Sequence, residues 1–293
     1  MTTHIEKSFD SFAAIGLAAL NEKAEMLARI DNKYILRAHQ LQPAIASFAE
    51  VFDCLDIDGL RGFDYSTVYF DDDELRGYYD HHQRRRKRCK ARIRSYVDAD
   101  LHYLEVKLND RRSTTLKKRL RIAAPAVELD RQAFDFIDSC YREVYGEPFR
   151  KQLSGTIRIT YRRYTLVAKD GGERMTLDTG MHFAAGGAAA TPPHDMFIIE
   201  TKSARGNGIA DKILRSLHVK PTKRVSKFCI GLAATGQVQR CNGFLPALRR
   251  LEMVENEPIR QTAAMIERHQ IAHVKPWAFP YPASPTLFAR QGA

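Results

Sequence analysis

Cations occupy alternate positions of the segment KRCKARIRSY, residues 87–96, at Arg88, Lys90, Arg92 and Arg94. Side chains two positions apart on a β-strand point to the same side of a sheet. The spacing therefore predicts a strand with one cationic face and one face that can pack on a core. A guanidinium group pairs two phosphate oxygens at once and an ammonium group acts as a point charge, so such a face suits a polyanion.

The same alternation recurs on other predicted strands. In residues 101–108, Glu105 and Lys107 share one face, whereas Leu104 and Val106 share the other. A polar face turned to solvent is the simplest explanation for any one such strand. The pattern recurs on several strands, however, and like charges opposite one another on neighbouring strands are destabilising unless an anion lies between them. We therefore expect a closed antiparallel barrel with a basic interior and an apolar exterior covered by helices.

The remaining segments complete an α+β fold. Helices are expected at about residues 8–28, 40–53, 130–145, 208–217 and 244–270. Strands are expected at about residues 29–36, 64–71, 87–96, 101–108, 114–122, 156–168, 173–179, 196–202 and 224–232. The stretch 184–195, rich in glycine, alanine and proline, predicts a flexible loop. We predict one domain over residues 1–293, with an N-terminal helix at 1–28, a tunnel core at 29–232 and a C-terminal helical segment and tail at 233–293.

The composition supports an anionic partner. Lysine and arginine number 46 against 35 aspartates and glutamates, which gives a formal net charge of +11. This excess suits phosphate polymers, nucleotides, nucleic acid or an acidic membrane surface. The five cysteines are widely spaced without a C-x-x-C pair, which is typical of reduced thiols in a cytosolic protein. No apolar run is long enough for a signal peptide or a membrane helix, so we expect a soluble, cytoplasmic protein.

Three polar motifs have simpler explanations than catalysis. His81 and His82 have no third metal ligand nearby and are expected in an exposed turn. The acids at 71–73 lack the spacing of a calcium loop and are expected in a turn at a strand end. The run QRRRKR, residues 83–88, is similar to a nucleic-acid-binding patch. Its cations alternate into a strand without an aromatic stacking platform, so we do not expect nucleic acid as the partner.

Nine fragments of the chain carry a family resemblance. In order, they are RIDNKYIL, YSTVYFDDDELRGYYDHH, RCKARIRSY, YLEVKL, TLKKRL, YRRY, RMTLD, IIETKS and RVSKF, between about Arg29 and Leu232. This series resembles the VTC domain, the polyphosphate polymerase domain of the vacuolar transporter chaperone complex. That family belongs to the triphosphate tunnel metalloenzyme (CYTH-like) superfamily. The resemblance implies an antiparallel eight-stranded β-barrel, the triphosphate tunnel, with helices packed on the outside.

The resemblance also implies roles for individual residues. The phosphate-binding residues expected to act in catalysis are Arg92, Arg94, Lys107, Lys117, Arg163 and Arg174. Those expected to bind substrate are Lys33, Tyr161, Arg224, Ser226 and Lys227, with Arg88 and Arg119 as further candidates on the same strand faces. Glu200 matches the carboxylate that holds a divalent metal, Mn²⁺ or Mg²⁺. Glu105 is expected to be an ion-pair partner of Lys107 or of a neighbouring arginine.

The implied activity is transfer of the γ-phosphoryl group of ATP to a polyphosphate chain. CYTH-type members begin with Glu-x-Glu-x-Lys, whereas RIDNK here supplies Arg29, Asp31 and Lys33. Fewer acids and more cations favour holding a long anionic chain over activating water, so a transferase is preferred to a hydrolase. A tunnel triphosphatase acting on tripolyphosphate or a nucleoside triphosphate, and a non-catalytic polyphosphate or nucleotide sensor, remain alternatives. Neither an inositol-phosphate-sensing SPX region nor a membrane segment is evident.

Overall fold

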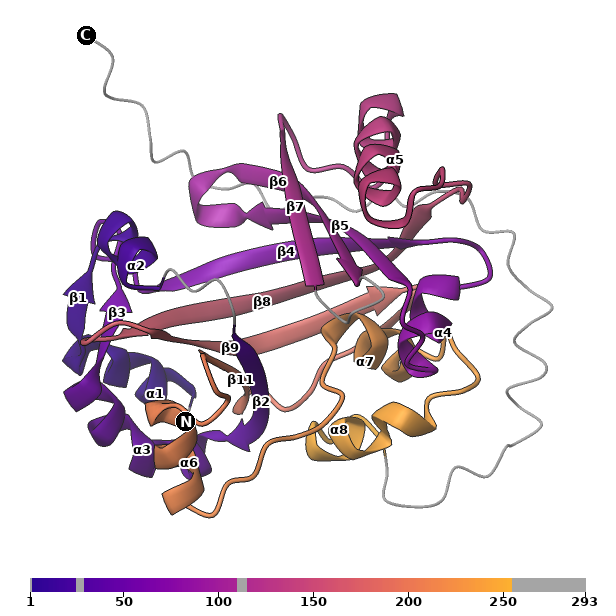
Figure 1. Ribbon diagram of the computed structural model, residues 1–293. Helices are drawn as coiled ribbons and strands as arrows, with labels where there is room; N and C mark the ends of the chain where they lie inside the picture. Colours follow the sequence, from indigo (N-terminus) through magenta and orange to yellow (C-terminus); the bar gives the residue numbers. More distant parts are fainter. Residues whose placement is uncertain (1, 25–28, 110–114, 255–293) are drawn as a thin grey trace, which may run out of the picture. The chain divides into compact units, whose positions relative to one another are not determined.

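One large sheet organises the protein. The computed structural model describes residues 2–24, 29–109 and 115–254 (Figure 1). Eight of the strands form a continuous antiparallel path in the order β2-β11-β9-β8-β4-β5-β6-β7. Their bounds are β2 Ile30–Arg37, β4 Gly62–Asp71, β5 Arg88–Tyr96, β6 Leu101–Asn109, β7 Thr115–Ile122, β8 Ser154–Ala168, β9 Glu173–Ala185 and β11 Met196–Ser203. Three short strands, β1 Ala13–Ile15, β3 Phe52–Leu55 and β10 Ala188–Ala190, join this sheet at its margins.

The expected antiparallel strands are present, but the prediction of a closed barrel is not met. In the described part of the chain, β2 and β7 stand at the two ends of the path and do not pair with each other. A segment that follows the strands covers the free edge of β2 instead. The backbone N–H of Thr222 donates to the carbonyl of Lys33 over 2.7 Å, and the Lys33 ammonium donates to the carbonyl of Val225 over 3.1 Å. The first of these bonds uses a backbone carbonyl of β2 that a strand closing the barrel would need.

The open sheet is nevertheless strongly curved. Lys33 on β2 and Lys107 on β6 are six strand positions apart, about 29 Å in a flat sheet with a spacing of ~4.8 Å. The Lys33 ammonium donates to the carbonyl of Val225 over 3.1 Å, and the ammonium of Lys90, opposite Lys107 in register, donates to the adjacent Ser226 over 3.3 Å. These cations therefore lie far closer together than a flat sheet would allow. The two ends of the path therefore face each other across a concave surface.

The outer, convex face is apolar and covered by helices, as the alternation predicts. Helices α1 Thr2–Ser8, α3 Ala38–Val51 and α6 Ile209–Ser216 pack on β2, β11, β9 and β8 around Phe48, Phe52 and Phe197. Helix α5 Arg131–Tyr145 packs on β5 and β6 around Leu104 and Ile137. Burial of these side chains drives the sheet to bend around its polar face, because each apolar side chain removed from water contributes about 1.5–3 kcal/mol.

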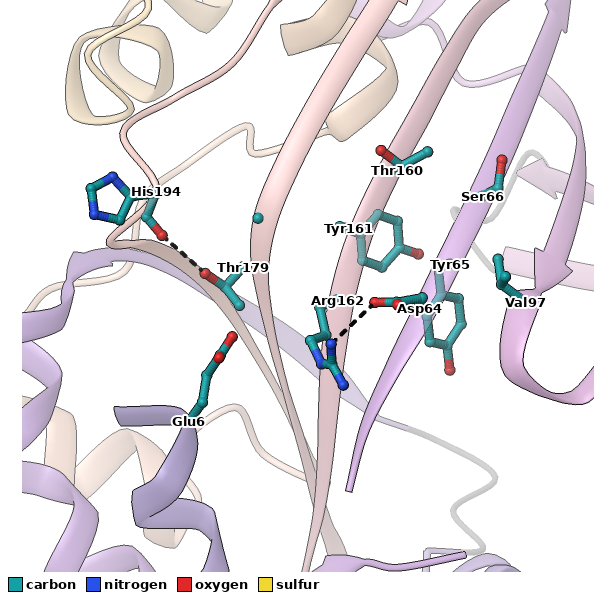
Figure 2. Close-up of a pocket in the computed structure, with 11 residues that line it drawn as sticks. Glu6, Asp64, Tyr65, Ser66, Val97, Thr160, Tyr161, Arg162, Thr179 and His194 are labelled. Atoms are coloured by element: carbon teal, nitrogen blue, oxygen red, sulfur yellow. Dashed lines mark hydrogen bonds and ion pairs between the residues drawn. The ribbon is translucent and has the colours of Figure 1, made fainter. Parts of the chain in front are cut away.

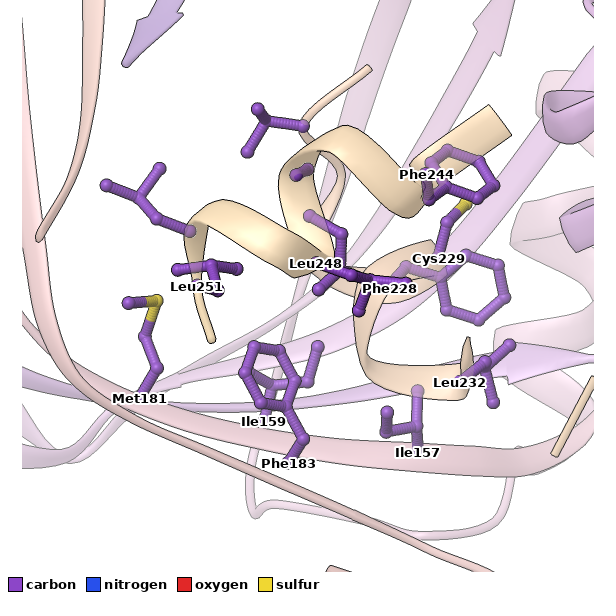
Figure 3. Close-up of a cluster of buried hydrophobic side chains, with 14 of the residues drawn as sticks. Ile157, Ile159, Met181, Phe183, Phe228, Cys229, Leu232, Phe244, Leu248 and Leu251 are labelled. Carbon is purple, nitrogen blue, oxygen red and sulfur yellow. The ribbon is translucent and has the colours of Figure 1, made fainter. Parts of the chain in front are cut away.

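A second helical layer covers the concave face over β8 and β9 at one end, and Lys107 on β6 stays exposed. Helices α4 Arg76–His82, α7 Lys227–Ala234 and α8 Leu245–Arg250 pack against β8 and β9 at this end. Figure 3 shows Phe228 and Leu232 of α7 above Ile157 and Phe183 of the sheet. The same face is thus apolar where α7 covers it and cationic further along the strands.

For two segments the predicted type of secondary structure is wrong. Residues 8–28 do not form one helix: η1 Phe9–Ser11, β1 and α2 Leu17–Lys23 follow α1, and β1 breaks the helix because it pairs in parallel with β3. Residues 224–232 form no strand. The Ser226 hydroxyl accepts from the N–H of Cys229 over 3.5 Å and begins helix α7, since an N-terminal serine satisfies a free N–H of the first turn.

Only part of the predicted C-terminal segment lies within the described residues. Helix α8 ends at Arg250, and the rest of the expected helix at 244–270 lies outside the described residues from 255 onward. The single-domain boundary at 293 stays a prediction for the same reason. The expected loop at 184–195 contains the hairpin of β9 and β10 at its start. Short helices η2 Val97–Ala99 and η3 Asn242–Phe244 complete the fold, and no described helix is long and apolar enough to span a membrane.

Helix α5 offers a test of the outer layer. The Asp130 side chain accepts from the N–H of Ala133 over 2.8 Å and caps the helix. We expect Asp130→Ala to lower the free energy of unfolding by about 1 kcal/mol, measured by urea denaturation. Asp135→Ala removes an equal charge from an exposed position within the same helix and should change stability by less than about 0.5 kcal/mol. Equal effects of the two substitutions would contradict the cap.

Candidate phosphate-binding site

The concave surface of the sheet gathers cations from seven strands. We call this set the cationic face. It consists of Lys33 on β2, Lys90, Arg92 and Arg94 on β5, Lys107 on β6, Lys117 on β7, Arg163 on β8, Arg174 on β9 and Lys202 on β11. The strand register brings like charges directly opposite one another, with Lys107 between Lys90 and Lys117. Such neighbours repel, so the arrangement requires negative charge nearby.

Glu105 supplies part of that negative charge at the β5–β7 side. Its carboxylate lies 2.7 Å from Nε of Arg92 and 2.6 Å from the ammonium of Lys117, and its side chain is only 2% exposed. Burial alone would raise the pKa of Glu105, but Arg92, Arg94 and Lys117 outweigh it and lower the pKa well below its usual range. The prediction that Glu105 pairs with a neighbouring arginine is confirmed, whereas Lys107 forms no ion pair with it.

Asp178 also supplies negative charge to the cationic face, near the middle of the sheet. It accepts two bonds from the Arg163 guanidinium, one of them 2.7 Å long, and it also pairs with Lys227 at the start of α7. Burial opposes ionisation of this carboxyl, yet Arg163 and Lys227 lower its pKa to about 2. Asp178 therefore fixes two of the predicted phosphate-binding residues in place.

Glu200 is the third acid on the cationic face. It lies 3.4 Å from the ammonium of Lys33 and also contacts Lys202, and its side chain is 19% exposed. Burial opposes ionisation, but Lys33 and Lys202 hold the pKa of Glu200 well below its usual range. Asp31 lies 3.9 Å from Lys202 on the other side. Glu200 is thus an ionised carboxylate that solvent and ligands can reach.

Four cations of the face lack a close carboxylate among the described residues. Arg174, Lys90 and Lys107 have no ion-pair partner there, and the guanidinium of Arg94 comes no nearer than 3.8 Å to Glu105. The Nε atoms of Arg94 and Arg174 are buried without a hydrogen-bond partner. A buried donor without an acceptor costs about 1–3 kcal/mol. These donors are the strongest sign that an anionic ligand completes the site.

Crowding also changes the protonation of groups on this face. Partial burial is the main cause that lowers the pKa of Lys117 to about 8, with Arg92 and Arg94 acting in the same direction against Glu105. Burial would raise the pKa of Tyr69, but Arg92, Arg94 and Lys90 outweigh it and lower the pKa to about 8. The phenol of Tyr69 accepts from Arg92 over 2.7 Å. Both shifts report a strongly positive potential.

Aromatic rings orient the guanidinium groups. The rings of Tyr65 and Tyr161 stack with centroids 5.2 Å apart. The guanidinium of Arg163 lies over both rings, at 5.2 and 5.3 Å from their centroids, and that of Arg94 lies 5.6 Å from Tyr65. A cation over a ring face is attracted by its quadrupole, which limits the rotamers available to these long side chains. The Lys227 ammonium lies 4.8 Å from the ring of Tyr161.

The remaining predicted site residues differ in how they lie relative to the cationic face. Ser226 accepts from the ammonium of Lys90 over 3.3 Å and therefore borders the face. Arg119 is opposite Glu105 in register and lies over the ring of Tyr103 at 5.0 Å. Arg88 begins β5, and its Nε is buried without a partner. Arg224, in contrast, makes no described contact with the cationic face.

Arg224 has a positive φ of 59°, and its guanidinium contacts Gly243 of η3 rather than any described cation or acid of the cationic face. This left-handed backbone turns the side chain away from the direction that an extended strand at 224–232 would give it. Three residues of the face were not among the predicted site residues: Lys90, Lys202 and Asp178. Each lies two positions along the chain from a predicted residue or another polar residue of the same strand face, so alternation was the available signal.

The motif around His81 also differs from its expectation. His81 and His82 lie in helix α4 rather than in an exposed turn. The His81 ring stacks on Phe244 with centroids 6.0 Å apart, and His82 bonds to the side chain of Asn242 over 2.7 Å. Asp71 ends β4, as predicted for a turn at a strand end, and its carboxylate accepts from the N–H groups of α4.

The oxygen ligands present fit a divalent metal only together with a phosphate ligand. No group of three His, Cys, Asp or Glu side chains able to hold a metal occurs in the described residues. Mg²⁺ is usually held by one or two carboxylates plus phosphate oxygens of the substrate. Glu200, with Asp31 beyond Lys202, meets that requirement. Glu105 and Asp178 do not, because their side chains are only 2% and 1% exposed, against 19% for Glu200.

A cavity of about 710 Å³ lies beside the central strands β4 and β8 (Figure 2). Asp64 and Arg162 line it, and so do Tyr65 and Tyr161, with which they alternate along β4 and β8. Asp64 and Arg162 lie 3.9 Å apart and offset each other. The cavity has mixed charge and does not share the chemistry of the cationic face.

Comparison with known proteins identifies the family. The family model of the VTC domain matches residues 28–235, more than half of the chain. The chain therefore belongs to the VTC domain family. A comparison with curated proteins gives no match.

Solved structures show distant likenesses. The PH1819 protein of Pyrococcus horikoshii OT3 has a TM-score of 0.41 at 15% identity, over 70% of this chain and 98% of that chain. The Hippeastrum protein HpAC1, proposed as an adenylyl cyclase and described as having a dominant triphosphatase activity, has a TM-score of 0.38 at 15% identity, over 70% and 97%. A proposed adenylate cyclase of Vibrio parahaemolyticus has a TM-score of 0.37 at 10% identity, over 70% and 99%. The family assignment rests on the VTC match and not on these low scores.

Substitution of Glu105 tests the charge balance. We expect Glu105→Gln to lower the free energy of unfolding by about 3 kcal/mol in urea, because it leaves Arg92 and Lys117 facing each other without a carboxylate. The same change should tighten tripolyphosphate binding in calorimetry, since the ligand meets one more positive charge. Glu143→Gln, which breaks the exposed pair with Lys118, should alter stability by less than about 1 kcal/mol and leave binding unchanged. A Glu105 variant as stable as this control would refute the proposed balance.

The lowered pKa of Lys117 predicts a pH dependence of binding. Above pH 8 the ammonium loses its proton and Tyr69 gains a negative charge, so tripolyphosphate affinity should fall as pH rises through about 8. One linked proton with a pKa of about 8 weakens affinity by about fivefold between pH 8 and pH 9. Calorimetry from pH 6.5 to 9.5 measures this change, and Lys117→Met should flatten it. Since titration of the ligand is common to both proteins, parallel curves for wild type and variant would contradict the assignment to Lys117.

Proposed function

We propose that this protein is a metal-dependent polyphosphate polymerase that transfers the γ-phosphoryl group of ATP to a polyphosphate chain held on the cationic face. The observation that carries the proposal is the surplus of cations on that face. Glu105, Asp178 and Glu200 engage some of them, while Arg94, Arg174, Lys90 and Lys107 are left for a phosphate ligand. Membership in the VTC domain family supports a polyphosphate ligand in particular.

The reaction needs positioning more than it needs an acid or a base. A terminal oxygen of the chain attacks the γ-phosphorus of ATP, a new P–O bond forms, and the bond to ADP breaks. ATP and a chain of n phosphates thus give ADP and a chain of n + 1. The attacking oxygen is already anionic, so no side chain has to remove a proton. Phosphoryl transfer of this type depends on in-line placement and charge stabilisation.

The cations of the face would provide both in-line placement and charge stabilisation. Arg92, Arg94 and Arg163 are held by Glu105, Asp178 and the tyrosine rings, so little conformational entropy is lost when they bind phosphate oxygens. Glu200, with Asp31 nearby, would hold Mn²⁺ or Mg²⁺. Such an ion would offset negative charge on the phosphate oxygens. Lys33 and Lys202 keep the Glu200 carboxylate ionised for that purpose.

The distribution of acids favours transfer over hydrolysis. A hydrolase must activate water, which calls for a free base or a second metal centre. The buried acids Glu105 and Asp178 are engaged by cations, and Lys202 lies between Glu200 and Asp31. These contacts leave no carboxylate of the described face in a suitable state to act as a base. A triphosphatase is the alternative that the product analysis must exclude.

Product analysis decides between these activities. Purified protein is incubated with ATP and Mn²⁺, and ADP, orthophosphate and long-chain polyphosphate are quantified in the same reaction. We expect polymer in amounts that match ADP. Orthophosphate without polymer would identify a triphosphatase, and tight polyphosphate binding without turnover would identify a sensor.

Glu200→Gln tests the proposed metal ligand. The variant should lose metal-dependent turnover by at least about 100-fold, the range found when a charge-stabilising group is removed, while it still binds tripolyphosphate in EDTA. Glu74→Gln removes an exposed carboxylate, 70% exposed, and serves as the matched control with full activity. Wild-type turnover in the Glu200 variant would eliminate this role.

A further inference from the structure

The loop that leads into β5 carries an exposed group of cations outside the cationic face. Residues 83–87 connect α4 to β5, and all five are exposed. Among the described residues, Arg85 pairs with Asp80 at 3.2 Å and Lys87 pairs with Glu147, whereas Arg84 and Arg86 have no ion-pair partner. We call Arg84 and Arg86 the basic loop. Two exposed guanidinium groups without acids are free to bind an anion.

The basic loop is continuous with the cationic face through one strand. β5 begins at Arg88, and Arg88, Lys90, Arg92 and Arg94 follow on one side of it. Same-side residues of a strand are about 6.7 Å apart, so this row spans about 20 Å. That span exceeds what the three phosphoryl groups of a triphosphate can contact at once. A ligand that uses the whole row must be a longer chain.

Part of the unneutralised charge of the face lies toward the loop end of the row. Glu105 engages Arg92, but Lys90 and Lys107, which face each other in register, have no carboxylate, and Nε of Arg88 is buried without an acceptor. His81 at the end of α4 senses the same charge. Its pKa is lowered to about 2 by burial, Lys90, Arg88, Lys33 and Lys107, in that order. Arg88, Lys90 and Lys107 thus continue the cationic face toward the loop without a carboxylate among the described residues.

We propose that a polyphosphate chain longer than a triphosphate leaves the cationic face along β5 and is held outside it by Arg84 and Arg86. This inference rests on the proposed function, because it assumes that phosphate chains occupy the cationic face. Its consequence is a preference for long chains that the cationic face alone would not give. The opposite ends of the strands, near Arg205 after β11, are the other direction in which a chain could leave.

The test compares short and long ligands in metal-free buffer with EDTA, so that it does not depend on turnover. The double variant Arg84→Gln/Arg86→Gln is compared with Arg131→Gln/Arg205→Gln, which removes the same charge from exposed positions elsewhere. Calorimetry measures the dissociation constants for tripolyphosphate and for a chain of about 50 phosphates. Binding to phosphate polymers releases counterions, so the slope of log affinity against log salt counts the phosphate contacts.

We expect the basic-loop variant to bind tripolyphosphate within twofold of wild type. Its affinity for the long chain should fall about tenfold, and its salt slope should decrease by about one to two. The control variant should match wild type for both ligands. Unaltered long-chain binding in the basic-loop variant would refute the inference, and so would an equal loss for both ligands.

Three further outcomes are informative. Weakened long-chain binding in the control variant alone would mean that the chain leaves near Arg205, which also refutes the inference. Single-stranded RNA of about 50 nucleotides that binds as tightly as polyphosphate, with the same dependence on Arg84 and Arg86, would mean that the loop is a nucleic-acid surface instead. If wild type fails to bind tripolyphosphate at all, the proposed function falls, and that result is distinct from failure of the loop alone.

Discussion

Repulsion among arginine and lysine side chains on one concave face is the constraint on which the rest of the structure depends. The strand register places Lys90, Lys107 and Lys117 side by side, and curvature adds Lys33 from the far end of the strand path. Such a face folds only if negative charge offsets it. Buried acids provide part of that charge, and the remaining donors are left for a ligand. The unpaired cations therefore cost stability, and the proposed phosphate site would make use of them.

The apolar layers determine where this face is accessible. Outer helices α3, α5 and α6 bury the convex side of the sheet and favour its curvature. Helix α7 fills one end of the concave side with Phe228 and its neighbours (Figure 3). It also contributes Lys227, whose ion pair with Asp178 joins this apolar layer to the charged face. Packing and electrostatics are thus coupled at the start of α7, where the Ser226 hydroxyl caps the helix and also accepts from Lys90.

Membership in the VTC domain family and the charge distribution lead to the same chemistry. A phosphoryl transfer between two anions requires cations fixed in place more than it requires an acid or a base. Glu105, Asp178 and the stacked rings of Tyr65 and Tyr161 fix the arginines before any ligand arrives. Glu200 differs from the other two acids because its side chain is partly exposed. That difference in exposure separates a carboxylate that can serve a metal from carboxylates that organise cations.

The sequence by itself determined which side chains share a strand face, because alternation with a period of two is a local property. It thereby predicted most of the strands, the apolar exterior under helices, and the grouping of Arg92, Arg94, Lys107 and Lys117. Only the tertiary structure decided which of these cations are neutralised, since Glu105, Asp178 and their partners meet across strands through register and curvature. It also decided that the sheet stays open, because the segment with Thr222 bonds to the edge of β2, and that residues after Ser226 form a helix. Bonds between segments distant in the chain leave no periodic signal, so the position of Arg224 could not be read from its neighbours.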